Sequence, residues 1–162
     1  VGFVKIDGAR VSEAGARNHV EILVKDLTPE DVFRGDVFYD SAVQKRHVPA
    51  EAISFTATIA VKKAPELLSK GSTVTVECHS SSSPCIVDSI AWNLQQDTKA
   101  RELEKYPDLV KSGSGAIIKF KPQAPFVVEK AREFPALGRI IVREGNRILA
   151  VGVITAVEKG KQ

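Results

Sequence analysis

The sequence contains no methionine, a single tryptophan, two cysteines and no run of about 18 apolar residues. Without such a run no helix can span a membrane, and we expect neither a membrane partner nor a signal peptide. Cys78 and Cys85 are too few for a disulfide framework, and no second Cys/His pair completes a zinc site. We therefore expect two reduced thiols in a cytoplasmic protein. The lack of methionine indicates a piece of a longer polypeptide.

The signatures of catalysis and of nucleotide binding are also missing. No glycine-rich loop ends in Gly-Lys-Ser or Gly-Lys-Thr, so we expect no nucleotide binding by that mechanism. His19, His47 and His79 are scattered, and no Ser/His/Asp pattern accompanies them. The net charge of +3 permits contact with phosphates without requiring it. The sequence therefore predicts a chain without catalytic residues, metal ligands or cofactors of its own.

What the sequence does contain is a series of short apolar runs rich in β-branched residues, as strands are. These predicted strands occupy 1–6, 19–24, 53–61, 73–79, 86–94, 115–120, 126–129, 138–143 and 148–157. Within 32–39, Gly35 fits a turn or bulge before one further strand. Residues 26–31 predict a short helical turn, and 68–71 predict a turn. Residues 80–84 predict a polar bend, and 99–106 predict an exposed charged loop. This spacing is typical of an all-β fold, and closing it into a barrel removes exposed edges.

A polar stretch at 41–51 predicts a linker between two domains. Residues 1–48 hold three or four strands, so we expect them to be the C-terminal part of one β-barrel. Residues 53–160 have enough strands to close alone, and we expect an antiparallel barrel of about six strands over 54–156. Four apolar residues are expected to point mainly inward: Leu137, Ile141, Val151 and Val153.

Three arginines near the C-terminus are the candidate binding residues. Arg139 and Arg143 are four apart in a predicted strand and should share one face. Arg147 follows across a Gly145–Asn146 turn, a pair that suits a tight hairpin. Guanidinium groups on a rigid sheet can hold phosphates with two hydrogen bonds each. The alternative is that they form surface ion pairs with the nearby acidic residues Glu129, Glu133 and Glu144.

The last third of the chain contains four short patterns in order. They are Lys-Ser-Gly-Ser-Gly-Ala-Ile-Ile at 111–118, Lys-Pro at 121–122 with Val-Val-Glu at 127–129, Phe-Pro-Ala-Leu-Gly-Arg-Ile-Ile-Val-Arg-Glu at 134–144, and Ala-Val-Gly-Val-Ile at 150–154. Their order and spacing resemble the third domain of elongation factor 1-alpha and elongation factor Tu.

Two upstream patterns extend this resemblance. Arg-Gly-Asp-Val at 34–37 is similar to a segment near the end of the family's second domain. Phe-Thr-Ala at 55–57 resembles the strand that opens the third domain. On this resemblance, 1–48 is the end of the second barrel and 53–160 is the third domain.

The resemblance implies a function in delivery. In this family the two barrels carry tRNA, or a protein that mimics tRNA, to the ribosomal A site. GTP and magnesium are bound by a separate GTPase domain, which these 162 residues do not include. The implied partners are thus tRNA or a release-factor-like protein, the ribosome and the chain's own GTPase domain. Arg139, Arg143 and Arg147 would contact the cargo. So would His79, which begins the family's His-Thr-Ala motif, here His-Ser-Ser; a lone histidine is more often a packing residue.

Departures from the family pattern bear on which cargo is carried. Where elongation factor 1-alpha has Asn-His-Pro, residues 61–65 read Val-Lys-Lys-Ala-Pro, and 90–108 differ most. These differences favour the branch of Hbs-type rescue GTPases and of the GTPase partner of the eukaryotic release factor. An elongation factor that delivers aminoacyl-tRNA is the alternative. From other classes, the barrels of a sulfate-activating sulfurylase subunit or a plain interaction domain also fit.

Overall fold

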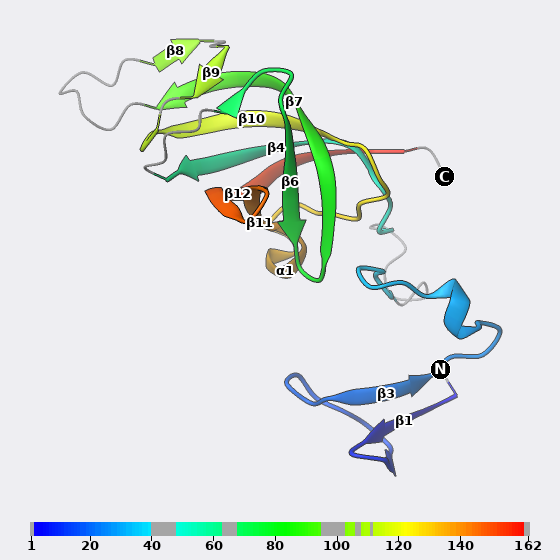
Figure 1. Cartoon of the computed structure of the whole chain (residues 1–162). Helices are drawn as coiled ribbons and strands as arrows, with labels where there is room; N and C mark the ends of the chain where they lie inside the picture. The colour runs from blue at the N-terminus through cyan, green and yellow to red at the C-terminus, as the bar shows by residue number, and fades with distance from the viewer. Residues whose placement is uncertain are drawn as a thin grey trace. The chain divides into compact units, whose positions relative to one another are not determined.

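The fold was obtained as a computed structural model, which describes residues 2–39, 48–62, 68–94, 103–105, 108–110 and 112–160. The chain divides into two compact units, Val1–Phe33 and Arg34–Gln162 (Figure 1). Within the described residues, no helix is both long enough and apolar enough to cross a membrane.

The first unit is a three-stranded antiparallel sheet in the order β2-β1-β3. Its strands are β1 (Phe3–Ile6), β2 (Ala9–Val11) and β3 (Val20–Leu23). The strands expected at 1–6 and 19–24 are confirmed, whereas β2 was not foreseen. Asp7 and Gly8 both have positive φ in the tight turn that joins β1 to β2.

The predicted helical turn at 26–31 is a single 3-10 turn, η1 (Pro29–Asp31). Thr28 precedes it, and both the backbone N–H and the hydroxyl of Thr28 donate to Asp31 Oδ2 at 2.9 Å. These two hydrogen bonds lower the pKa of the Asp31 carboxyl. The turn begins with Pro29. Proline has no backbone N–H, and this costs nothing here because an N–H in the first turn of a helix has no acceptor within the helix.

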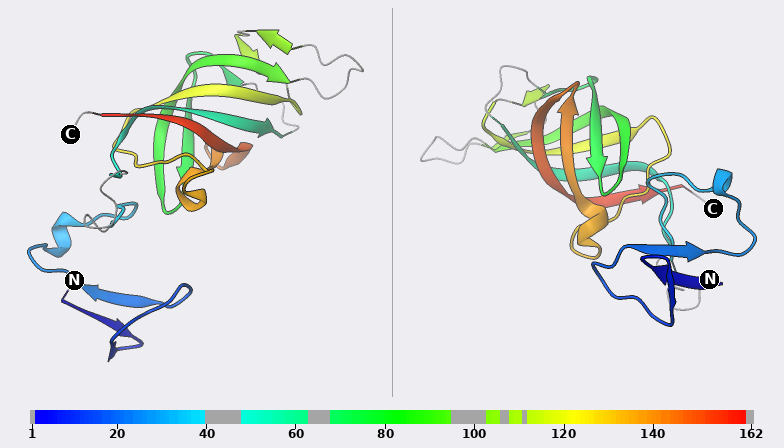
Figure 2. Two further views of the ribbon diagram at one scale, coloured as in Figure 1. Left: turned by 180° about the vertical axis from the view of Figure 1, so that it is seen from behind. Right: turned by 60° about the horizontal axis from the view of Figure 1, so that its bottom comes forward.

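The second unit contains a closed six-stranded antiparallel barrel, as predicted. The barrel strands are β4 (Ala52–Val61), β6 (Thr73–Cys78), β7 (Ser81–Leu94), β10 (Gly115–Pro122), β11 (Arg139–Glu144) and β12 (Arg147–Lys159). They are hydrogen bonded in the order β10-β4-β12-β11-β6-β7, and pairing of β10 with β7 closes the ring (Figures 1 and 2).

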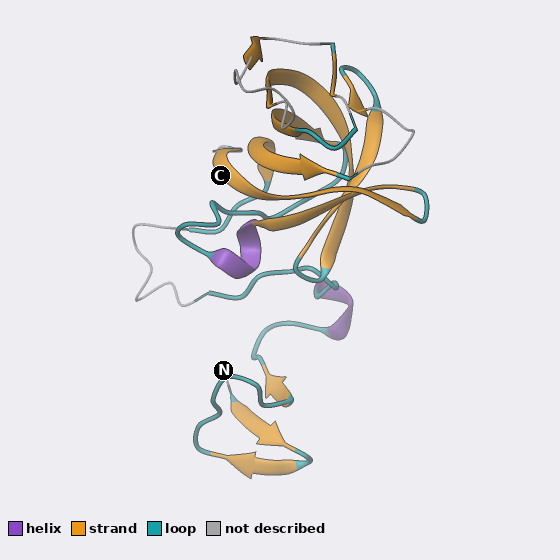
Figure 3. Ribbon diagram, turned by 90° about the vertical axis from the view of Figure 1, so that its left-hand side faces the viewer, coloured by secondary structure: helices purple, strands orange, loops and turns teal. Residues whose placement is uncertain are grey.

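Short elements complete the second unit. β8 (Leu103–Lys105) extends the sheet from the end of β7. β5 (Leu68–Ser69) pairs with β9 (Leu109–Val110). One turn of helix, α1 (Pro135–Gly138), precedes β11 and is drawn in purple in Figure 3.

Four local predictions were wrong. The strand expected after the turn at Gly35 does not form, because the described residues 36–39 belong to no strand. The serine run at 80–84, expected to be a polar bend, mostly belongs to β7, because Ser81 to Pro84 pair with β6. The strand expected at 126–129 is reduced to one bridge between Glu51 and Val127. Of the charged loop expected at 99–106, residues 103–105 form β8 and the others lie outside the described residues. Most of the predicted linker at 41–51 also lies outside them.

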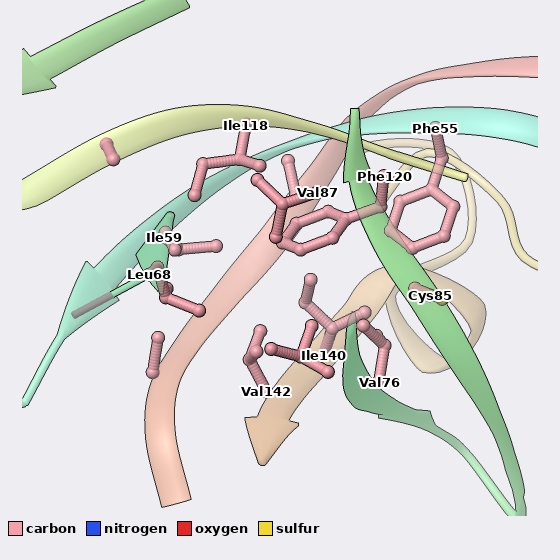
Figure 4. Close-up of a cluster of buried hydrophobic side chains, with 14 of the residues drawn as sticks. Phe55, Ile59, Leu68, Val76, Cys85, Val87, Ile118, Phe120, Ile140 and Val142 are labelled. Atoms are coloured by element: carbon pink, nitrogen blue, oxygen red, sulfur yellow. The ribbon is translucent and has the colours of Figure 1, made fainter. Parts of the chain in front are cut away.

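The barrel core is built from the inward side chains of all six strands, and Figure 4 shows its central cluster. Phe55 and Phe120 stack with ring centroids 5.4 Å apart, and the Phe126 ring lies 6.0 Å from that of Phe55. All three rings are at most 1% exposed. Fully burying one such side chain stabilises the folded state by about 1.5–3 kcal/mol.

The side chains expected to point inward do not. Ile141, Val151 and Val153 are 36%, 44% and 41% exposed, and Leu137 is half-buried in α1. The inward positions of β11 and β12 are the neighbouring ones: Ile140, Val142, Ala150 and Ile154. A strand has a side-chain period of two, so a shift of one residue exchanges the two faces. Because both faces of this hairpin carry β-branched residues, the apolar pattern did not distinguish them.

Candidate functional site

The outward face of β11 carries two of the three candidate arginines. Along this strand Ile140 and Val142 are buried, so Arg139, Ile141 and Arg143 share the outer face. Across the hairpin, Ile141 is the register partner of Val151. The two arginines are therefore separated by a patch of apolar side chains.

Arg143 is held by an acidic residue that the sequence did not suggest. Its Nη1 donates to Glu77 Oε1 at 2.8 Å, and its Nη2 donates to the Asn146 carbonyl at 3.4 Å. Glu77 lies on β6, next to β11, directly opposite Ile141. The Arg143 Nε is buried and has no hydrogen-bond partner among the described atoms. Arg143 is thus a charge-compensated side chain fixed to the barrel wall.

Two of the three acidic residues considered as partners of the arginines, Glu129 and Glu133, pair with lysines. Glu129 is almost fully buried, and its Oε1 accepts from Lys159 Nζ at 2.6 Å. Glu133 Oε1 accepts from Lys130 Nζ at 3.1 Å. Both carboxylates therefore have a lysine as a charged partner.

A shallow hollow of about 450 Å³ lies on the outer wall formed by β6, β11 and β12. Its centre is apolar and consists of Ile141, Val151 and Val153. Its polar lining is supplied by Glu77, His79 and Arg139. The chemistry of this surface is an apolar patch with one acidic side chain, one basic side chain and one imidazole beside it.

Gly152 forms part of the hollow, between the two exposed valines. A side chain here would collide with the Thr58 carbonyl and with Ile59 on β4. Glycine therefore lets β12 pack closely on β4, while Val151 and Val153 project outward on either side.

His79 occupies the two-residue turn between β6 and β7, where Cys78 pairs with Ser81. Its φ is +45°, a conformation in which a non-glycine residue is strained. Its Nε2 donates to the Val127 carbonyl at 3.1 Å, since a carbonyl can only accept. The contact fixes the imidazole beside the hollow.

Arg147 is not part of the hollow. It begins β12 and is the register partner of Glu144, whereas Arg139 is the partner of Val153. Arg139 and the Arg147 end of the hairpin are thus about five residues apart, or roughly 17 Å along a strand. The structure brings Arg139 and His79 to one surface and does not gather the three arginines into one phosphate clamp.

The barrel matches a known family. The sequence pattern of that family, described as GTP-eEF1A C-terminal domain-like, matches residues 54–155. The chain belongs to this family. The match covers β4 to β12 and therefore includes every strand that lines the hollow.

Curated relatives extend the match beyond the barrel. The chain is 36% identical over 161 residues to elongation factor 1-alpha of Metallosphaera sedula, covering 99% of the chain and 36% of the relative. It is 34% identical over 159 residues to elongation factor 1-alpha of Serendipita indica, covering 98% and 34%. The chain thus spans about a third of the length of these relatives. The resemblance to elongation factor 1-alpha found in the sequence is confirmed.

Solved structures show the same fold. The chain matches sup35 complexed with GMPPNP with a TM-score of 0.78 and 19% identity, covering 97% of this chain and 37% of that one. For sup35 complexed with GDP, the TM-score is 0.71 at 21% identity, with the same coverage. At this identity the likeness concerns the fold.

Sequence reasoning found the arginines of this family member but missed Glu77 and the apolar centre. Residues 73–78 alternate with Val74, Val76 and Cys78 inward, so Glu77 could have been placed on the outer face. Its contact with Arg143 depends on the pairing of β6 with β11, which joins segments 66 residues apart. Nothing in either strand alone indicates that pairing.

Proposed function

We propose that this chain is the cargo-binding module of a translational GTPase and that the hollow on β6, β11 and β12 receives a release-factor-like or rescue-factor-like protein. The GTPase domain, with GTP and magnesium, would belong to the same longer protein. The module itself would carry no chemistry. It would hold the cargo during delivery to the ribosomal A site.

The observation that carries this proposal is the exposure of Ile141, Val151 and Val153 at the centre of the hollow. Apolar side chains gathered at one exposed place are typical of protein-binding surfaces. Protein interfaces have an apolar, charge-poor centre and a polar rim. A surface for the nucleic-acid backbone would instead present cations to phosphates.

The charges around the hollow also support a protein cargo. Glu77 compensates Arg143 at 2.8 Å, so that arginine is not available as a second cation beside the patch. Arg139 is exposed, and no acidic side chain in the described ranges pairs with it. One available arginine beside an apolar patch matches a partner with apolar side chains and a nearby carboxylate.

Delivery of aminoacyl-tRNA is the second candidate. It is favoured by the identity of 34–36% to elongation factor 1-alpha. Arg139 would then contact the tRNA backbone, and binding would weaken steeply with salt because each neutralised phosphate releases counterions.

The test is a pull-down with the whole protein loaded with a non-hydrolysable GTP analogue. We expect a release-factor-like protein in the bound fraction, identified by mass spectrometry. Replacing Val153 with Asp should weaken this binding by about 2 kcal/mol, as for a central contact residue. Ile53→Asp is the matched control, because Ile53 is 50% exposed on β4 and does not line the hollow. Recovery of aminoacyl-tRNA without any such protein would contradict the proposal.

A further inference from the structure

Two residues of the Arg-Gly-Asp-Val segment, Arg34 and Gly35, contact the barrel close to His79. Arg34 Nε donates to the Ser80 carbonyl at 3.2 Å. Gly35 has φ of +107°, and a Cβ at this residue would lie 2.7 Å from both Cβ and Oγ of Ser81. Glycine is therefore required here twice, for its backbone conformation and for its lack of a side chain.

The two contacts fall on the turn that carries His79 and on the residue directly after it. This turn consists of His79 and Ser80 and joins β6 to β7. Ser81, beneath Gly35, is the first residue of β7 and the register partner of Cys78. Arg34 and Gly35 thus contact the two residues that follow His79 in the chain.

The same turn borders the hollow. Both Cys78 and His79 line it. The His79 Nε2 donates to the Val127 carbonyl at 3.1 Å. A non-glycine residue at φ of +45° keeps this conformation only where its surroundings fix it.

We infer that Arg34 and Gly35 are positioning residues that fix the β6–β7 turn and thereby hold His79 at the edge of the hollow. The Arg34 hydrogen bond orients the Ser80 peptide, and the close packing of Gly35 on Ser81 fixes the start of β7. The effect on cargo rests on the proposed function. The positioning of His79 does not, so it is tested without cargo.

The first experiment follows the His79 imidazole resonances by NMR in the whole protein. Gly35→Ala adds a Cβ that collides with Ser81, so the His79 resonances should shift. Gly71→Ala is the matched control: its φ of +83° imposes a similar conformational penalty, but a Cβ there meets nothing within 4 Å. It should leave the His79 resonances unchanged. Equal shifts in both variants, or none in Gly35→Ala, would overturn the inference.

Arg34→Ala tests the same point without added bulk. It removes the hydrogen bond to Ser80 and should also shift the His79 resonances. Arg132→Ala, which removes an exposed arginine elsewhere in the same unit, should not. This pair keeps the inference testable if Gly35→Ala fails to fold. An unchanged His79 spectrum in Arg34→Ala would count against it.

The second experiment uses trypsin, which cleaves after arginine and can cut the bond between residues 34 and 35. We compare Gly35→Ala with Gly35→Ala/Ser81→Gly, because both have the same residues at the cleaved bond. The double variant lacks the Cβ and Oγ of Ser81 that the added methyl group at residue 35 would strike. Cleavage should therefore be severalfold slower in the double variant than in the single one. Equal rates would show that the packing of residue 35 on residue 81 does not hold the segment.

Discussion

The two units of the chain use similar strands and differ in what they bury. In the barrel unit, 22 of the described apolar residues form one buried cluster. In the first unit, no described residue is buried, and Val20, Ile22 and Leu23 are 37%, 53% and 48% exposed. A sheet must cover its apolar face with a second layer or close on itself, and among the described strands those of the barrel close on themselves. The comparison indicates that the barrel supplies most of the folding free energy.

The largest expected effect comes from emptying the barrel core. Phe120→Ala removes a ring that is fully buried and stacked on Phe55. The loss should lower the free energy of unfolding by about 3–5 kcal/mol. Ile22→Ala, at a site 53% exposed in the first unit, should change it by less than about 0.5 kcal/mol. Urea denaturation of both variants measures the contrast, and similar losses would contradict the unequal division of stability.

The second prediction compares the cost of adding a methyl group at a glycine of the barrel unit and at a glycine of the first unit. A Cβ at Gly138 would strike backbone atoms of Ala131 and the Glu129 carbonyl, so the added methyl group can be accommodated only by a backbone shift. Gly138→Ala should therefore destabilise the barrel by about 1–3 kcal/mol, as overpacking does. Gly8, in the first unit, has open space around it and φ of +81°. Gly8→Ala therefore adds only conformational strain, and thermal unfolding should show a smaller loss. A larger loss in Gly8→Ala would be the contrary result.

Much of this architecture could be predicted from the sequence, because the barrel strands alternate and have turn signals between them. Gly35 and Gly145, at which turns were expected, have positive φ. The start of β7 was missed because serine and proline have low strand propensity, and only pairing with β6 makes Ser81 to Pro84 a strand.

The candidate site was less predictable than the fold. The placement of Arg139 and Arg143 on one face needs only the strand period. The apolar centre of the hollow requires knowing which face of β12 is outward, and both faces carry apolar residues: Val151 and Val153 on one, Ala150 and Ile154 on the other. The Glu77–Arg143 pair depends on long-range register. The site therefore arises from pairing between distant strands, which single-strand patterns do not encode.

The third prediction concerns how the stability of the barrel depends on pH through its two cysteine thiols, Cys78 and Cys85. Burial raises the pKa of Cys78 to about 11 and that of Cys85 to about 12, from an ordinary value of 9.0. At pH values between 9 and these folded-state pKa values, the thiols therefore stay protonated in the folded protein and ionise in the unfolded chain. Their contribution to stability is fully present below pH 9 and declines as pH rises from there towards the folded pKa values, by about 1 kcal/mol per pH unit for each thiol.

The measurement is urea unfolding between pH 8 and pH 10, on the wild type and on Cys78→Ala/Cys85→Ala. The alanine variant is less stable overall, but its stability should fall less with pH. Parallel pH dependences in the two proteins would show that the thiols contribute nothing to it.

The smallest expected effect on stability, and the most informative about cargo, is that of Glu77→Gln. The ion pair with Arg143 is about one-third exposed on both sides, so losing it should cost no more than about 1 kcal/mol. The substitution leaves the Arg143 guanidinium uncompensated on the same outer face as Arg139. The outer wall then presents two cations, as a phosphate-binding surface would.

Binding of a tRNA probe to the whole Glu77→Gln protein should strengthen, and the dependence of log K on log salt should steepen by about one phosphate contact. Glu144→Gln, an exposed acidic residue on the same strand as both arginines and outside the hollow, is the control and should change neither quantity as much. If Glu77→Gln leaves tRNA binding and its salt dependence unchanged, compensation of Arg143 does not determine which cargo this surface accepts.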